Sequence, residues 1–143
     1  MVDNATIVHE VETAYEAYAN AFNQGDMAIV VRYLAAPYIM TIGNRDVMIA
    51  ASDEAVRHQF DGALAGMKQR GWVRSDFKVV HVFLLSDNHG LLMTDIVRYK
   101  ADGSVLEKGR YIYQVRRGGQ SWQITGVTDV EPPYTGPGDT PRS

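Results

Sequence analysis

Residues 91–116 read LLMTDIVRYKADGSVLEKGRYIYQVR, and this stretch decides the fold. Apolar and polar residues alternate on both sides of Ala101-Asp102-Gly103-Ser104. Asp-Gly is a favoured centre for a two-residue hairpin turn, because both central residues of that turn need a positive φ. Similar runs lie on either side of this hairpin, so we predict four long antiparallel strands in a row between Trp72 and Glu131.

The hairpin fixes a register in which two ion pairs cross between neighbouring strands. If the two outer residues of the turn are paired, Asp95 lies opposite Arg110 and Arg98 lies opposite Glu107. Side chains alternate between the faces of a strand, and positions 95 and 98 have opposite parity. The two pairs therefore lie on opposite faces of the sheet, and at most one of them faces the helices.

Composition sets the bounds on class and partners. A chain of 143 residues is one domain, which we expect to span residues 1–130, followed by a Pro/Gly-rich, loosely ordered tail at 131–143. The net charge of −3 and the absence of a basic stripe argue against nucleic acid as a partner. The sequence has no cysteine, signal-peptide core or apolar membrane span, so no membrane association is expected and a cytoplasmic location is the default.

The N-terminal half predicts helices and two short strands. Apolar residues at helical spacing predict a first helix over 4–23, a second from Asp26 to Ala36 that Pro37 ends, and a third that Ser52 or Asp53 caps and Gly71 closes. Short β-branched runs at 38–42 and 47–49 predict two strands between the second and third helices.

The strand predicted over 73–86 is apolar on both parities through its centre. Val79, Phe83 and Leu85 share one parity, and Val80, Val82 and Leu84 share the other. Such a strand is covered on both faces. Helices cover one face of a small curved sheet, so we expect a homodimer to cover the other.

This order of elements resembles the nuclear transport factor 2-like superfamily, including its SnoaL-like and ketosteroid isomerase branches. The residues that carry the resemblance are YANAFNQGD at 18–26 and WQIT at 122–125. It implies an α+β fold in which a cone-shaped, curved antiparallel sheet wraps around three N-terminal helices. It also implies an apolar pocket and frequent dimerisation. The superfamily hosts isomerases, dehydratases, cyclases, epoxide hydrolases and plain binding modules, so it does not decide the function.

The ketosteroid isomerase branch can be compared position by position. Its oxyanion tyrosine aligns with Tyr18, which matches. Its carboxylate base aligns with Ile42 and its second oxyanion acid with Arg110, and both depart from the pattern. An apolar residue cannot abstract a proton, so isomerisation by that mechanism is not expected. The alignment nevertheless suggests that Asp95 and Arg110 face the pocket.

Two classes of function follow. The first is a cofactor-free acid–base enzyme acting on an apolar carbonyl or hydroxyl compound, with Tyr18 as donor, Arg110 as electrostatic stabiliser, Asp95 as orienter and His81 as base. Asp95 is a poor base beside an arginine, which lowers a carboxyl pKa. The second is a non-catalytic dimeric module that binds a small apolar ligand.

His81 joins Asp95 and Arg110 in a row only if the turn after Ser86 has three loop residues. Each candidate also has a structural alternative: core packing for Tyr18, a register-fixing ion pair for Asp95 and Arg110, and a satisfied interface residue for His81. The side chains predicted to line the ligand pocket are Tyr15, Phe22, Met40, Phe60, Met93 and Ile112. The other histidines lack metal-ligand spacing, and we expect neither a metal nor a cofactor.

Overall fold

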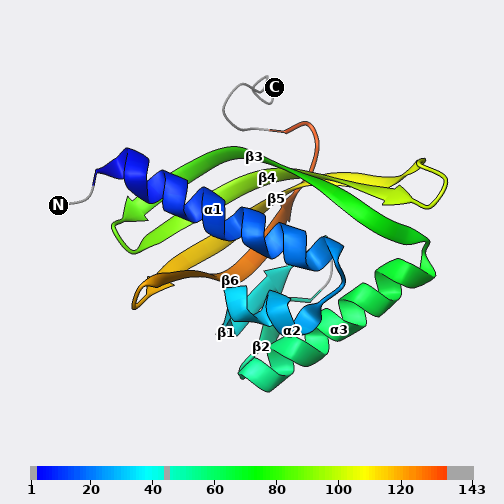
Figure 1. The fold of residues 1–143 in the computed structure, drawn as a ribbon, viewed down its shortest axis with the longest axis horizontal. Helices are drawn as coiled ribbons and strands as arrows, with labels where there is room; N and C mark the ends of the chain where they lie inside the picture. The colour runs from blue at the N-terminus through cyan, green and yellow to red at the C-terminus, as the bar shows by residue number, and fades with distance from the viewer. Residues whose placement is uncertain (1–2, 44–45, 135–143) are drawn as a thin grey trace.

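The computed structural model describes residues 3–43 and 46–134, which form helices packed on one side of a curved sheet (Figure 1). The helical elements are α1 (Asn4–Asn23), α2 (Met27–Val30), a 3-10 turn (Val31–Tyr33) and α3 (Asp53–Gln69). The strands are β1 (Leu34–Thr41), β2 (Met48–Ala50), β3 (Trp72–Ser86), β4 (His89–Lys100), β5 (Val105–Gly118) and β6 (Ser121–Val130). Their order in the sheet is β2-β1-β6-β5-β4-β3.

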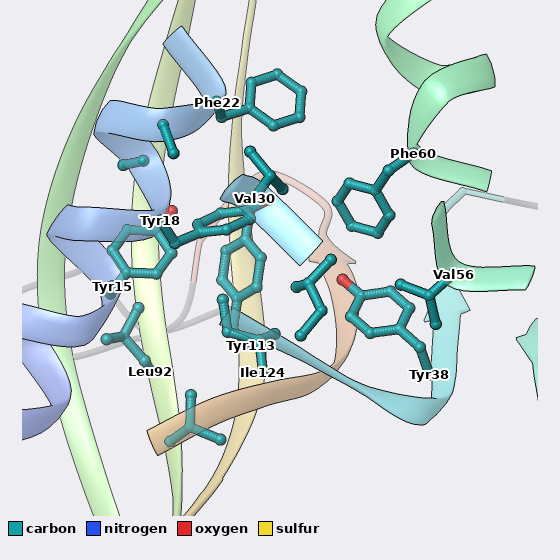
Figure 2. Close-up of a cluster of buried hydrophobic side chains, with 14 of the residues drawn as sticks. Tyr15, Tyr18, Phe22, Val30, Tyr38, Val56, Phe60, Leu92, Tyr113 and Ile124 are labelled. Carbon is teal, nitrogen blue, oxygen red and sulfur yellow. The ribbon is translucent and has the colours of Figure 1, made fainter. Parts of the chain in front are cut away.

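The α+β class and the four long strands are confirmed, with one correction to the sheet. Strands β3 to β6 are antiparallel neighbours, but β1 pairs with β6 in parallel, so the sheet is mixed and not antiparallel throughout. In the interior, α1 packs against β3 and α3 packs against β1. The buried aromatic and aliphatic side chains between these helices and the sheet form the core (Figure 2).

The central hairpin has the predicted register and a different turn. Asp95 lies opposite Arg110, and Arg98 opposite Glu107. Among the turn residues only Gly103 has a positive φ, 86°, so the predicted turn with two positive φ angles is wrong. A register shift directly beside the turn absorbs the difference, which is why the pairing further along the strands is as predicted.

The predicted second helix is too long. It ends at Val30, passes through one 3-10 turn, and gives way to β1 at Leu34. Leu34 pairs with Ile124 of β6, so tertiary pairing overrides the helix propensity of the alanines that follow. Pro37 does not end a helix. It lies within β1 where the pairing register shifts, a position at which its missing N–H leaves no gap in the ladder.

The third helix and the two short strands are confirmed, with shifted boundaries for the strands. The Ser52 hydroxyl accepts a hydrogen bond from the Ala55 N–H at 3.1 Å and caps α3. Gly71, with a φ of 97°, follows the end of the helix as predicted. The helix therefore runs straight into β3, and its last turn stays beside the sheet.

Strand β3 contains a bulge that exchanges its two faces. The register shifts between Val79 and His81, so Val79 shares the helix-facing side with Val82 rather than with Phe83. Phe83 points to the outer face of the sheet, and Leu85, at a second register shift, is 57% exposed. The strand is apolar on both faces, but the predicted grouping of its residues is wrong on one side of the bulge.

Among the described residues, no helix is both long and apolar enough to cross a membrane.

The predicted tail begins beyond β6, and only its first residues are described. Tyr134 lies over Arg110 on the outer face, with 4.6 Å between the guanidinium carbon and the ring centre. Residues 135–143, to which most of the loose-tail prediction applies, lie outside the described residues.

Candidate functional site

A cavity of about 650 Å³ lies between α3 and the concave face of the sheet. Most of its wall is apolar, and the aromatic part comes from all sides: Phe22 from α1, Tyr38 from β1, Phe60 from α3 and Phe77 from β3. Phe22, Tyr38 and Phe60 face one another across this region (Figure 2). A cavity of this volume and lining suits a small apolar molecule.

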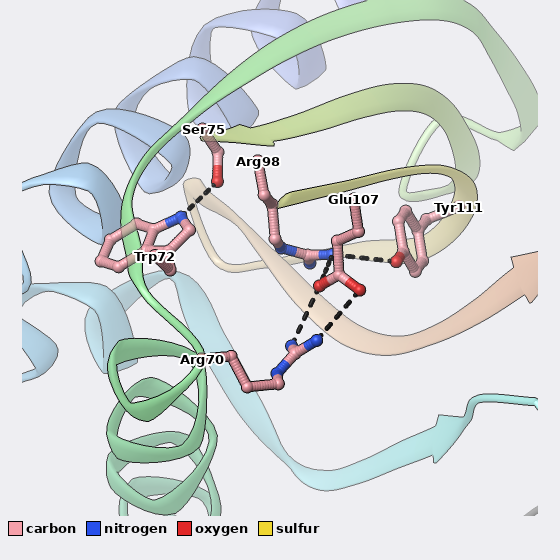
Figure 3. A network of polar contacts seen from close by, with 6 residues as sticks. All are labelled: Arg70, Trp72, Ser75, Arg98, Glu107 and Tyr111. Carbon is pink, nitrogen blue, oxygen red and sulfur yellow. Dashed lines mark hydrogen bonds and ion pairs between the residues drawn. The ribbon is translucent and has the colours of Figure 1, made fainter. Parts of the chain in front are cut away.

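The end of α1 is clamped to β3 beside the cavity. The Asn23 side chain donates to the Ser75 carbonyl and accepts from the Ser75 N–H, both at 2.8 Å. The Ser75 hydroxyl also accepts from the Trp72 indole N–H at 2.8 Å (Figure 3). These bonds fix the last turn of α1, and with it the positions of Tyr18 and Phe22 in the wall.

Three buried tyrosines supply neutral hydroxyls to the cavity. Burial raises the pKa values of Tyr18, Tyr38 and Tyr113 above the ordinary phenol value, and neighbouring phenols add to the shift for Tyr18 and Tyr38. All three are therefore protonated at neutral pH. The hydroxyl of Tyr38 is buried and has no hydrogen-bond partner among the described residues. Such an unpaired group costs roughly 1–3 kcal/mol, so it requires an explanation.

Glu107 is held between two arginines at the edge of the cavity (Figure 3). Arg70, at the end of α3, donates two hydrogen bonds to its two carboxylate oxygens, at 3.0 and 3.1 Å. Arg98 donates a third at 3.2 Å. The bonds from Arg70, followed by the charge of Arg98, lower the pKa of Glu107 against the opposing effect of burial. Glu107 is therefore an anion at neutral pH and a poor general base.

Arg98 is the more buried of the two arginines, with 17% of its side chain exposed. One terminal nitrogen donates to Glu107 and to the Tyr111 hydroxyl, the latter at 3.1 Å. Its Nε–H is buried and has no partner among the described residues. Two residues of the cavity wall, Tyr38 and Arg98, thus carry a buried polar group without a partner among the described residues, and each group can donate a hydrogen bond.

The structure places Asp95 and Arg110 on the outer face, away from this cavity. They form a two-bond ion pair, with Arg110 Nε and a terminal nitrogen donating at 2.7 and 3.0 Å. Neither residue lines the cavity. Ile96 and Arg98 do line it, and both have the opposite parity to Asp95 in β4. The expectation that Asp95 and Arg110 face the pocket is therefore wrong, and Arg98 with Glu107 is the pair that does.

His81 is also on the outer face. The turn before β4 has two loop residues, because Ser86 pairs with His89, and the register shifts once more between Leu84 and Ser86. His81 consequently lies opposite Met93, and Lys78 lies opposite Asp95. The predicted row of His81, Asp95 and Arg110 does not form. His81 is exposed and contacts the Phe83 ring edge-on.

The predicted ligand-lining residues divide into two groups. Tyr18, predicted as a donor, lines the cavity, as do Phe22, Met40 and Phe60. The remaining three do not line it. Tyr15 is buried in the core, where its hydroxyl lies 3.2 Å from that of Thr94, and Met93 and Ile112 are paired on the outer face.

The residues that sequence reasoning missed carry a readable signal. In β5, Tyr111 shares its face of the strand with Tyr113 and Val115, whereas Arg110 shares the other face with Gln114. The more apolar parity faces the helices. Comparing the two faces residue by residue would have placed Tyr113, Glu107 and Arg98 inside. Arg70 and Tyr38 have no such signal, because α3 and β1 meet this region only in the folded chain.

Within the described residues, no three His, Asp or Glu side chains are grouped so that they could hold a metal ion. The chemistry that the arrangement offers is hydrogen-bond donation from neutral phenols and a guanidinium inside an apolar cavity. Such donors bind an oxygen acceptor, and they stabilise negative charge on it.

Residues 9–132 match the family described as NTF2-like protein (DUF6841). The chain belongs to this NTF2-like family. No curated protein matches the chain significantly.

Solved NTF2-like structures share the fold of this NTF2-like chain at low sequence identity. A ketosteroid isomerase-like protein from Erwinia carotovora is 16% identical with a TM-score of 0.62, covering 87% of this chain and 97% of its own. A scytalone dehydratase-like protein from Novosphingobium aromaticivorans is 8% identical with a TM-score of 0.68, covering 88% and 84%. An NTF2-like protein of unknown function from Shewanella oneidensis is 13% identical with a TM-score of 0.64, covering 85% and 96%. At these identities the likeness establishes the fold alone.

Proposed function

We propose that this protein binds a small, mainly apolar molecule that carries an oxygen acceptor, in the cavity beneath α3. The observation that supports this proposal is a mostly apolar wall in which two residues, Tyr38 and Arg98, carry a buried donor with no partner among the described residues. Buried polar groups are nearly always hydrogen-bonded. A ligand oxygen that accepts from either group removes a desolvation penalty that the empty protein carries.

Binding without catalysis accounts for the charged groups better than acid–base chemistry does. Among the described residues the one acidic side chain in the cavity wall is Glu107, and three hydrogen bonds from two arginines hold it as an anion of lowered pKa. An efficient base needs a pKa near the working pH. The phenols have raised pKa values and stay protonated, so they donate but do not abstract protons.

Binding can be tested by mass spectrometry of small molecules released from freshly purified protein, followed by calorimetric titration with the compounds found or with a panel of apolar ketones and acids. Tyr38→Phe should weaken binding about fivefold or more, because it removes one donor while keeping the ring. Tyr33→Phe is the matched control, since Tyr33 lies outside the cavity wall. If no apolar compound binds at millimolar concentration, or if both variants bind alike, the proposal is wrong.

A cofactor-free acid–base enzyme is the second candidate, and the same two donors favour it, because they would stabilise negative charge developing on a carbonyl oxygen. Solved structures of the same fold include isomerase-like and dehydratase-like proteins. In this alternative Arg98 takes the stabilising role that the sequence suggested for Arg110. Exchange of the α-protons of a bound ketone for deuterium, followed by NMR, separates the two candidates: binding alone predicts no exchange above the rate without protein.

We further propose that the protein is a homodimer joined through the outer face of the sheet. That face presents Phe83 and Leu91, both half-buried, with the 43%-exposed Ile39. Apolar surface of this kind is stabilised when a second copy covers it.

A further inference from the structure

The charged side chains of the cavity wall do not balance. Two arginines, Arg70 and Arg98, face a single carboxylate, Glu107, and no other charged residue lines the cavity within the described part of the chain. Glu107 is shared between both cations through bonds of 3.0 to 3.2 Å. One positive charge is therefore left without a matching anion.

This excess charge lies where water screens it least. Arg98 reaches the cavity with 17% of its side chain exposed, whereas Arg70 is 53% exposed at the end of α3. A guanidinium that is largely removed from water is stabilised by a full set of anionic or polar acceptors. Arg98 lacks an acceptor at Nε, so the uncompensated charge and the unpaired N–H coincide on one side chain.

From this arrangement we infer that the natural ligand is an apolar monocarboxylate whose carboxylate pairs with the Arg98 guanidinium while its hydrocarbon part fills the apolar part of the cavity. This inference rests on the proposed binding function and specifies the class of ligand. A carboxylate beside this guanidinium supplies the missing negative charge, and it brings the net charge of the cavity wall to zero. A neutral ketone or amide can accept a hydrogen bond but leaves the charge.

The inference also assigns a place to the apolar part of the ligand. Phe22, Phe60 and Tyr38 supply aromatic rings to the cavity wall (Figure 2), while Arg70, Arg98 and Glu107 supply its charged groups (Figure 3). A ligand with one charged end and one apolar end matches this division. A dianion does not, because only one positive charge is in excess.

The test uses matched pairs of probes that differ only in charge: 2-naphthoate with 2-naphthamide, phenylacetate with phenylacetamide, and hexanoate with hexanamide. Each is titrated into the full-length protein by calorimetry at neutral pH and low salt. For at least one pair the carboxylate should bind about tenfold tighter or more, because hydrogen bonds to a charged partner are about twice as strong as neutral ones. Raising the salt concentration should reduce this preference.

Variants then locate the preference. Arg98→Met should reduce the preference for the carboxylate to about threefold or less. Arg70→Met should do the same, because Arg70 lies at the surface and its loss leaves Glu107 to neutralise Arg98 alone. Glu107→Gln should increase it, since the cavity wall then holds two uncompensated cations. Arg57→Met is the control: it removes the same charge from an exposed pair with Asp61 outside the cavity, and it should keep the wild-type preference.

Three outcomes are distinguishable. A carboxylate preference that disappears in Arg98→Met or Arg70→Met but not in Arg57→Met supports the inference. If probes bind but every carboxamide binds within about threefold of its carboxylate, or if the control loses the preference equally, the inference is wrong and the binding function stands. If no member of any pair binds at millimolar concentration, both proposals are wrong.

Discussion

Replacing Glu107 by glutamine should destabilise the protein measurably at neutral pH. The change removes the anion that receives two hydrogen bonds from Arg70 and one from Arg98, and it leaves Arg98 as a largely buried cation. Breaking a fully buried pair costs roughly 3–5 kcal/mol, and an exposed pair is worth at most about 1 kcal/mol. Because 34% of the Glu107 side chain is exposed, water screens part of the effect, and we expect a loss of about 2 kcal/mol.

The loss should also depend on pH. The folded protein holds the pKa of Glu107 below its ordinary value of 4.5, mainly through Arg70. The stability that this carboxylate contributes is therefore fully present above pH 4.5 and disappears as the pH falls through the lower pKa of the folded state. The difference between wild type and Glu107→Gln should be constant from pH 6 to 8 and shrink below pH 4.5.

Urea unfolding of both proteins across this pH range measures the effect. The control is Asp61→Asn, which breaks the exposed Arg57–Asp61 pair and should cost about 0.5 kcal/mol or less. Combining Glu107→Gln with Arg98→Met should recover part of the loss, because the stranded charge is removed as well. A Glu107→Gln loss no larger than that of the control, or one that does not change at low pH, would refute the reasoning.

Three further predictions concern stability and assembly. Tyr38→Phe should raise the free energy of unfolding by about 1 kcal/mol, because it deletes a buried hydroxyl that has no partner among the described residues. Tyr15→Phe should lower it by about 1 kcal/mol, because it loses the contact with Thr94, and equal effects of the two variants in urea melts would contradict this. Gly126→Ala should lower the free energy of unfolding by about 2 kcal/mol, since the added Cβ would lie 2.8 Å from a backbone oxygen of β1. Gly62→Ala, in open space on α3, should raise the free energy of unfolding by up to about 1 kcal/mol, and thermal melts of the two variants test the contrast. Light scattering should give twice the 15.9 kDa chain mass, and a monomer mass at all concentrations would exclude the homodimer.

The sequence predicts the long strands and their pairing because the relevant signals are local. The Asp102-Gly103 turn and the alternation around it fix which residues of β4 and β5 lie opposite one another, and the structure has that register despite a different turn. The limit of the second helix could not be predicted locally, because Leu34 joins β1 through pairing with a strand near the other end of the chain.

Prediction of the site failed because the wrong one of two cross-strand ion pairs was assigned to the pocket. The register places two ion pairs on opposite faces, and the alignment with ketosteroid isomerases selected the outer pair, Asp95 with Arg110. The inner pair, Arg98 with Glu107, shares its face with Tyr113 and other apolar side chains. The placement of His81 failed because the turn after Ser86 has two loop residues and the register shifts again between Leu84 and Ser86, a shift that no glycine or proline marks in the sequence of β3.

The parallel pairing of β1 with β6 has a consequence for how the protein is made. More than half of the chain separates these two neighbours, and among the described residues β1 otherwise pairs only with the three-residue β2. During synthesis, β1 and the apolar side of α3 that packs on it have no β6 to pair with until residues 121–130 have left the ribosome. Contacts between such distant segments form slowly. The N-terminal half is thus the part of the nascent chain that most needs protection from aggregation, although it contains the most local structure.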